Sequence, residues 1–94
     1  MNFQELTEKL TTVAGAKGGI GKIIKFNTSD GAITINGDGT VTNIDGDSDC
    51  AIAVSTSDLN AIMSGDLNPM SAFMFGKLKV TGDMSVAMQL TNLF

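Results

Sequence analysis

The 94 residues have the length of one small domain, residues 1–94, and the composition excludes several classes of function. Hydrophobic residues make up 43% of the chain against 17% charged residues, which is enough apolar material for a packed core. The formal net charge is -4, with no Arg and no His. We therefore expect no nucleic-acid partner and no docking of the whole chain by charge onto an anionic membrane, because both need a basic face.

The first predicted element is a helix over about residues 2–14. Phe3, Leu6, Leu10 and Val13 recur at spacings of three and four, which marks one apolar stripe. Four glycines between positions 15 and 21 then interrupt the pattern, so the helix is expected to stop there.

Short strands are predicted next, over residues 23–26, 32–35 and 40–44. The run Asn-Gly-Asp-Gly at 36–39 is a strong hairpin signal, since Gly and Asn tolerate the positive φ of tight turns. These three strands predict an antiparallel meander. The run CAIAV at 50–54 is apolar at every position, which indicates a central strand covered on both faces. Its Cys50 is expected to be a small buried thiol.

From residue 55 the apolar spacing becomes helical. Ser55 and Asp58 form a pair similar to a capping box, and Gly65 is expected to end the helix that they begin. The apolar stripe of this helix consists of Leu59, Ile62 and Met63.

Three further elements complete the chain. Asn68 is a predicted N-cap and Pro69 the first residue of a short helix that Gly76 ends. Residues 77–81 alternate Lys with Leu and Val, which is typical of a half-buried edge strand. Asp83 then caps a final helix that is expected to run to the C-terminus.

The glycine-rich run at 14–22 is not a phosphate-binding loop. That motif needs Gly where Ala16 stands and Ser or Thr where Ile23 stands. The glycines also precede a predicted strand instead of a helix, so no helix N-terminus faces an anion. We interpret the run as a flexible connection.

Asp45, Asp47 and Asp49 resemble the start of a calcium loop. Such a loop needs Gly at its sixth position and Glu at its twelfth, where this chain has Cys50 and Thr56. The residues are therefore predicted to form a solvated acidic turn, and we expect no metal site.

Catalysis is also disfavoured. A chain without His, Arg or Tyr lacks the commonest general base, the oxyanion clamp and the phenol donor. Asp58 and Asp83 are accounted for as helix caps, so no nucleophile–base pair can be assembled. We expect a protein that is not an enzyme, with no catalytic residue and no cofactor.

The final helix carries two apolar stripes. One comprises Met84, Ala87 and Met88, and the other comprises Val86, Leu90, Leu93 and Phe94. A helix that packs only on a sheet needs a single stripe. The second stripe indicates a partner or a bound apolar ligand, and the alternative is a small core that Met fills adaptably.

The last third of the chain resembles the sterol carrier protein type 2 family, also called the sterol-transfer domain. The matching motifs are Ser71-Ala72-Phe73, Gly76-Lys77-Leu78-Lys79, Gly82-Asp83-Met84 and Ala87-Met88. The resemblance implies an α/β (α+β) fold with a five-stranded, mostly antiparallel sheet covered by helices. It also implies a hydrophobic lipid tunnel between the sheet and the helices.

The same resemblance implies non-enzymatic binding and transfer or presentation of a fatty acid, fatty acyl-CoA, sterol or isoprenoid-type lipid. The predicted lining of the tunnel is Ile62, Met70, Phe73, Met74, Met84, Ala87 and Met88. Lys77 and Lys79 are possible contacts for an anionic head group, or else edge-strand charges that discourage aggregation.

The alternative function is an accessory or dimerising interaction module of a lipid-biosynthesis complex. We expect a monomer or weak dimer with transient contacts to a membrane or a lipid enzyme. The N-terminal acids exclude a secretory signal, and the ending TNLF is not a peroxisomal address. A cytoplasmic location is therefore expected.

Overall fold

A computed structural model describes the protein from residue 2 to residue 89. The elements follow in the order α1 (Phe3–Lys17), β1 (Ile24–Thr28), β2 (Gly31–Ile35), β3 (Val41–Thr42), β4 (Cys50–Ala53), α2 (Thr56–Met63), α3 (Pro69–Met74), β5 (Lys79–Gly82) and α4 (Met84–Gln89). Within the described residues, no helix is both long enough and apolar enough to cross a bilayer.

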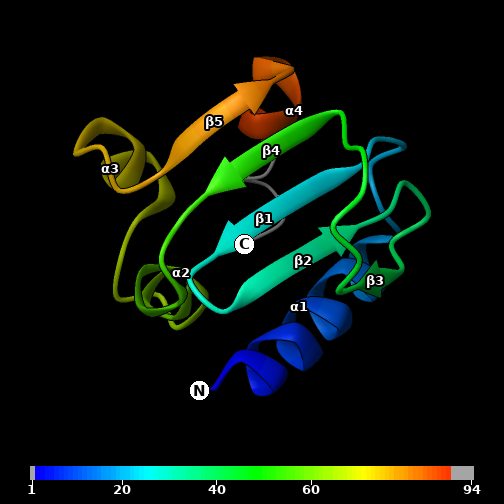
Figure 1. Ribbon diagram of the computed structural model, residues 1–94, viewed down its shortest axis with the longest axis horizontal. Helices are drawn as coiled ribbons and strands as arrows, with labels where there is room; N and C mark the ends of the chain where they lie inside the picture. Colours follow the sequence, from blue (N-terminus) through cyan, green and yellow to red (C-terminus); the bar gives the residue numbers. More distant parts are fainter. Residues whose placement is uncertain (1, 90–94) are drawn as a thin grey trace.

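The strands form one five-stranded sheet in the order β3-β2-β1-β4-β5 (Figure 1). β1, β2 and β3 make the predicted antiparallel meander, β4 lies parallel to β1, and β5 lies antiparallel to β4. The predicted α+β fold with a mostly antiparallel sheet is confirmed.

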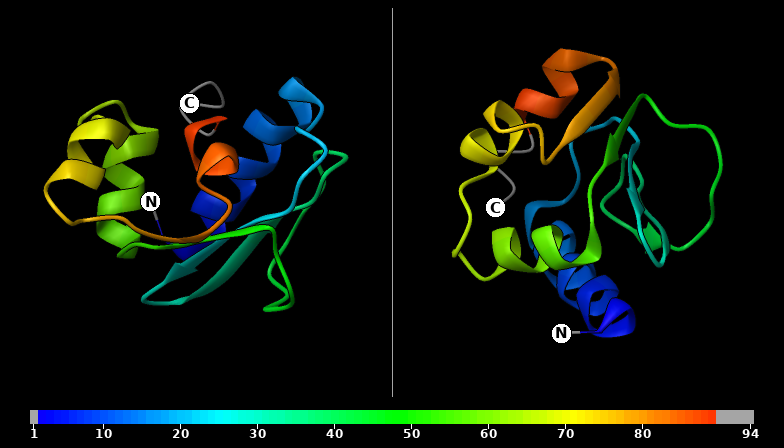
Figure 2. Two further views of the ribbon diagram at one scale, coloured as in Figure 1. Left: turned by 90° about the horizontal axis from the view of Figure 1, so that it is seen from above. Right: turned by 60° about the vertical axis from the view of Figure 1, so that its left-hand side comes forward.

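The helices lie on one side of the sheet, as Figure 2 shows most clearly in its left view. α1 packs against β2 and β3, and α4 packs against β4 and β5. The face of the sheet toward the helices is called the inner face below, and the opposite one the outer face.

Two rows of side chains cross the inner face, because paired residues in neighbouring strands point the same way. One row is Ile35, Ile24, Cys50 and Gly82, and the other is Ile33, Phe26, Ile52 and Val80. Every member with a side chain except Val80 is buried, which confirms the burial of Cys50. Leu6, Leu10 and Ala14 of α1 belong to the same core.

α1 is longer than predicted, because Gly15 lies inside the helix and Gly18 ends it. Gly18 adopts the left-handed conformation at φ 76°, and its N–H donates to the carbonyl of Ala14 at 3.0 Å. A glycine within a helix costs about 1 kcal/mol relative to Ala. Burial of Ala14, one turn beyond Leu10, offsets that cost.

The connection after α1 is tightly packed, so the expectation of a flexible connection is wrong. A Cβ at Gly19 would overlap the carbonyl oxygen of Gly37 in the hairpin turn. The N–H of Gly21 donates to that same oxygen at 3.0 Å. Gly19 is needed because two backbones meet here without room for its side chain.

β3 is shorter than the predicted strand over 40–44. Only Val41 and Thr42 pair with β2. Beyond them the side-chain amide of Asn43 donates to the carbonyl of Ala32 at 2.9 Å, so a side chain replaces the backbone ladder.

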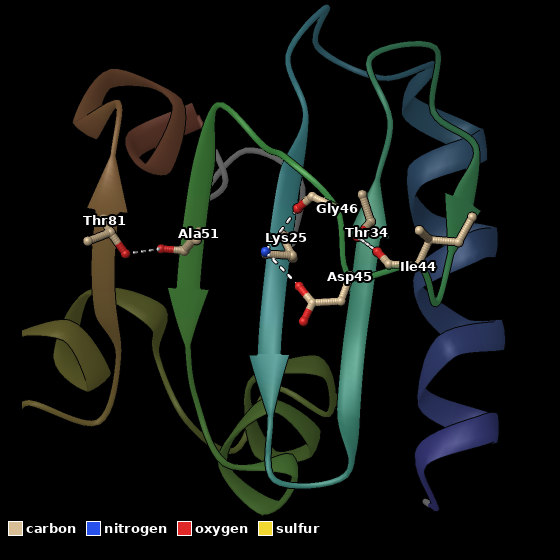
Figure 3. A network of polar contacts seen from close by, with 7 residues as sticks. All are labelled: Lys25, Thr34, Ile44, Asp45, Gly46, Ala51 and Thr81. Carbon is tan, nitrogen blue, oxygen red and sulfur yellow. Dashed lines mark hydrogen bonds and ion pairs between the residues drawn. The ribbon is translucent and has the colours of Figure 1, made fainter.

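The connection from β3 to β4 crosses the outer face of the sheet (Figure 3). The Nζ of Lys25 donates to Asp45 Oδ1 at 2.8 Å and to the Gly46 carbonyl at 2.9 Å. The hydroxyl of Thr34 donates to the Ile44 carbonyl at 2.8 Å. These contacts hold the segment over β1 and β2 and give the acidic turn a structural partner.

β4 lies between β1 and β5, as a central strand should, but it is covered on one face only. Cys50 and Ile52 are buried on the inner face, whereas Ala53 is exposed on the outer face. The prediction of a strand covered on both faces is therefore wrong. The two alanines made residues 50–54 look apolar at every position, although a side chain as small as alanine is found both in cores and at the solvent-exposed surface.

Candidate functional site

A pocket of about 170 Å³ lies between α3, α4 and the strands β4 and β5. Between residues 2 and 89, all of its lining residues are apolar: Ile52, Pro69, Met70, Phe73, Leu78, Val80, Met84, Ala87 and Met88. Met88 is 66% exposed and Met84 is 47% exposed, so the pocket is open to solvent on one side. An apolar cavity of about 150 Å³ accommodates a ring the size of benzene, so the pocket has room for part of an apolar ligand.

The floor of the pocket belongs to the sheet. Ile52 of β4 and Val80 of β5 are direct partners across the two strands. Leu78 comes two residues before Val80 and lies on the same side, because successive strand residues alternate between faces. Ile52 and Val80 of the floor are thus the end of the inner-face row that begins with Ile33 and Phe26 in the core.

The α3 wall is positioned by its N-cap. Asn68 Oδ1 accepts hydrogen bonds from the backbone N–H groups of Met70 at 2.8 Å and Ser71 at 3.4 Å. This confirms the cap predicted from the Asn-Pro pair. Ala72 is fully buried and fixes the helix against the core. Met70 and Phe73, half-exposed, face the pocket.

The α4 wall begins at Asp83, as predicted. Asp83 Oδ1 accepts from the backbone N–H of Ser85 at 2.9 Å and from its hydroxyl at 2.6 Å. These hydrogen bonds lower the pKa of Asp83 below its usual value, because they stabilise the ionised form. Val86 is buried against the core, whereas Ala87 and Met88 face the pocket.

The structure brings most of the predicted lining residues together. Those around the pocket are Met70, Phe73, Met84, Ala87 and Met88. Ile62 of α2 is instead buried in the core, and Met74 is 81% exposed outside the pocket. Lys77 and Lys79 are exposed and are not among the lining residues.

Sequence reasoning missed the floor of the pocket, namely Ile52, Leu78 and Val80, and it also missed Pro69 at the start of α3. The alternation of residues 77–81 already placed Leu78 and Val80 on the inner side. That signal does not distinguish a filled core from an open pocket. In the second predicted stripe of α4, Val86 packs into the core, and Leu90, Leu93 and Phe94 lie outside the described residues.

The ionisable groups near the pocket serve structure. Burial raises the pKa of the Cys50 thiol, and the charge of Asp83 raises it further, which keeps the thiol protonated and unreactive. Asp49 Oδ2 accepts from the N–H of Ile23 at 2.7 Å. Between residues 2 and 89, no three His, Cys, Asp or Glu residues gather where they could hold a metal ion.

Comparison with known proteins decides the family. The model of the SCP-2 sterol transfer family matches residues 3–94. The chain belongs to the SCP-2 sterol transfer family. Sterol carrier protein 2 of Oryctolagus cuniculus is 45% identical over 79% of this chain, and that of Homo sapiens is 44% identical over the same share. The chain spans about 15% of the length of these two relatives.

Solved structures agree on the fold. The crystal structure of sterol carrier protein 2 like 2 from Aedes aegypti matches with a TM-score of 0.83, covering 97% of this chain and 94% of that one at 20% identity. The solution structure of the palmitated form of the same Aedes aegypti protein matches with a TM-score of 0.81, over 99% of this chain and 94% of that one at 20% identity. The predicted resemblance to the family is confirmed.

Proposed function

We propose that the protein binds a long-chain lipid in the apolar pocket between α3, α4, β4 and β5, and carries or presents it unchanged. The candidate ligands are a fatty acid, fatty acyl-CoA, sterol or isoprenoid-type lipid. The unit that acts is the single domain of residues 1–94, in the cytoplasm and without cofactor. The observation that carries this proposal is a pocket that, within the described part of the chain, is lined by apolar side chains alone.

The energetics favour such a ligand. Each methylene transferred from water to an apolar site contributes roughly 0.8 kcal/mol. A fatty-acid chain would therefore bring on the order of 10 kcal/mol before the costs of ordering, and less where the pocket leaves it exposed. Micromolar affinity requires no specific hydrogen bond on this estimate. The palmitated form of the Aedes aegypti neighbour supports palmitate as a first probe.

The choice of wall residues supports a ligand of variable shape. Met70, Met84 and Met88 line the open side. Methionine is unbranched and polarizable, so it adapts to different apolar surfaces at low cost. We infer that the protein accepts several lipids of similar length.

The interaction-module alternative is not favoured. It would need α4 to present its apolar side to another protein, whereas Met84, Ala87 and Met88 face a pocket of the chain itself. The lysines Lys77 and Lys79 remain head-group candidates only for the part of a ligand that projects from the pocket.

The test is displacement of a fluorescent fatty acid by palmitate. Ala87→Phe should fill the pocket and weaken binding at least tenfold, on the order of 1.4 kcal/mol or more. Ala16→Phe, at an exposed position of α1, is the matched control and should bind within about twofold of the natural chain. Circular dichroism verifies that both variants fold. The proposal fails if palmitate does not displace the probe, or if Ala87→Phe binds like the control.

Salt gives a second test. Since none of the described residues that line the pocket is charged, affinity for an uncharged lipid should change little between low and moderate ionic strength. A steep loss of affinity with salt would mean that Lys77, Lys79 or another cation carries the binding.

A further inference from the structure

The C-terminal end of α3 exposes apolar side chains that the pocket does not use. Met74 is 81% exposed and Phe75 is 77% exposed, and neither lines the pocket. Lys77 follows two residues later and is also exposed. We call Met74, Phe75 and Lys77 the α3 tip. Figure 1 shows α3 at the outer edge of the molecule, beside β5.

The α3 tip belongs to a stretch of sequence whose charge is opposite to that of the whole chain. From Leu67 to Gly82 the sequence contains two lysines and no acidic residue, whereas the chain carries a net charge of -4. The nearest acids along the chain are Asp66 and Asp83, at the two ends of this stretch. The overall balance that disfavours an anionic membrane therefore does not apply to this stretch of the sequence.

We propose that the α3 tip docks onto the surface of an anionic lipid bilayer. Phe75 and Met74 enter the boundary between head groups and acyl chains, where an aromatic ring and a thioether are well accommodated. Lys77 then lies at the level of the lipid phosphates, and Lys79 reinforces it. The acidic remainder of the chain is repelled, so the protein docks in one orientation.

The position of the tip argues for a bilayer as its partner. Met70 and Phe73 of the same helix line the open pocket. Docking by α3 therefore brings the pocket toward the membrane, where a lipid ligand resides; this consequence rests on the proposed function, but the docking itself does not. A second copy of the chain fits the tip poorly, because a stable interface needs about 800 Å² from each partner. An aromatic side chain supplies only about 150–250 Å².

The experiment is cosedimentation with vesicles of phosphatidylcholine, with and without phosphatidylserine. The natural chain should bind the vesicles that contain phosphatidylserine and bind pure phosphatidylcholine more weakly. Phe75→Ser should lower the partition coefficient about tenfold. The matched control is Ile44→Ser, which changes a side chain that is 69% exposed in the β3–β4 connection. Its partition coefficient should stay within about twofold of the natural chain.

Charge is tested separately. Lys77→Gln should lower partitioning to the anionic vesicles about fivefold, since one cation near the surface contributes about that factor. Lys9→Gln on α1 removes an equally charged residue away from the tip and should have a smaller effect.

The two proposals fail in different ways. Phe75→Ser should keep the natural affinity for a fluorescent fatty acid in solution without vesicles, because Phe75 does not line the pocket. A chain that binds vesicles but no fatty acid supports docking and overturns the proposed function. Docking is overturned if the natural chain ignores anionic vesicles, or if Phe75→Ser partitions like Ile44→Ser. It is also overturned if size measurement reveals a dimer that Phe75→Ser dissociates.

Discussion

The helices cover the inner face of the sheet in two different ways. Beneath α1, the row of inward side chains that includes Ile33 and Phe26 is buried, and Leu6 and Leu10 pack onto it without exposure. Beneath α3 and α4, the same row continues through Ile52 to Val80 but ends in an open pocket. One sheet surface thus supports a closed region and an open one.

The difference follows from helix length and side-chain type. α1 has 15 residues and lays a continuous stripe of buried residues across the sheet. α3 has 6 residues and α4 has 6 among the residues that the structure describes, and each is fixed to the core there by one buried residue, Ala72 or Val86. A helix as short as α3 cannot cover the sheet completely, and Met70 and Phe73 of α3 line the pocket together with Met84, Ala87 and Met88 of α4. Incomplete coverage by apolar side chains is what suits the open region to the lipid proposed above.

The largest effect should separate the two faces of α4. Val86 is 1% exposed and Met88 is 66% exposed. Residues two apart in a helix point about 200° away from each other around the axis, so these two side chains lie on opposite sides of α4. Val86→Asp should unfold the protein, a loss beyond about 4 kcal/mol, because it buries an unpaired charge in the core. Met88→Asp should fold and lose lipid binding. Circular dichroism and fatty-acid displacement measure the two outcomes.

Swapped results would contradict the assignment of these faces. If Met88→Asp unfolds the protein while Val86→Asp folds without binding, the pocket lies on the other side of α4. If both variants fold and bind normally, α4 does not form a wall of the site.

Cavity-forming substitutions should separate the closed region from the open one. Leu10→Ala removes a fully buried side chain and should lower the free energy of unfolding by about 2–5 kcal/mol. Met88→Ala removes a largely exposed one and should cost less than about 1 kcal/mol. Urea denaturation measures both. Similar losses would mean that the pocket side is packed as tightly as the region under α1.

Two glycines offer the same comparison at the backbone. Gly19 lies at φ 80° and a Cβ there would overlap the hairpin backbone, whereas Gly76 lies at φ 76° with nothing within 4 Å of such a Cβ. Gly19→Ala should lower the free energy of unfolding by about 2–4 kcal/mol, because the steric overlap and the left-handed conformation both disfavour a Cβ there. Gly76→Ala carries only the conformational cost of about 1–2 kcal/mol. Equal losses in thermal denaturation would mean that the two connections do not differ in packing.

The closed region could be predicted from sequence because its signals are local. The stripe through Leu6 and Leu10 fixes the face of α1, and the run at 36–39 forms its hairpin with the N–H of Asn36 donating to the Thr40 carbonyl at 2.8 Å. The length of α1 could not be predicted, since Gly15 is kept helical by the burial of the neighbouring Ala14 on the sheet.

The open region could be predicted only in part. Residue spacing and the family resemblance predicted the helices α3 and α4 that form the two walls, because their N-caps, Asn68 and Asp83, can be recognised from the sequence. The sheet floor was missed, since the parallel pairing of β1 with β4 and the contact of Ile52 with Val80 depend on long-range topology. Ile62 was assigned to the lining for the same reason: its helical spacing gives a buried face without saying which neighbour that face meets.

The smallest effect concerns two exposed carboxylates, one in each region, that cap their own turns. Hydrogen bonds lower the pKa of both: those from Ser85 act on Asp83 at the start of α4, and those from Thr40 act on Asp38 in the β2–β3 hairpin. Each ionised carboxylate therefore stabilises the folded state at pH values above the usual carboxyl pKa of 3.8. This contribution is lost as the pH falls through the lowered pKa of the folded state.

Asp83→Asn and Asp38→Asn keep an oxygen that can accept the hydrogen bonds but remove the titration. The difference in melting temperature between the natural chain and each variant should therefore be largest near neutral pH and should shrink toward pH values below about 3.8.

The affinity for an uncharged fluorescent lipid should differ between the two variants and so distinguish the open region from the closed one. An uncharged ligand is used because it does not itself titrate. Asp83→Asn should weaken binding slightly at neutral pH, since Asp83 holds the first turn of the helix that carries Met84 and Met88. Asp38→Asn should leave binding unchanged. If the two variants change the affinity equally, a cap remote from the pocket affects lipid binding as strongly as the cap beside it. The closed region and the open region would then act as one unit.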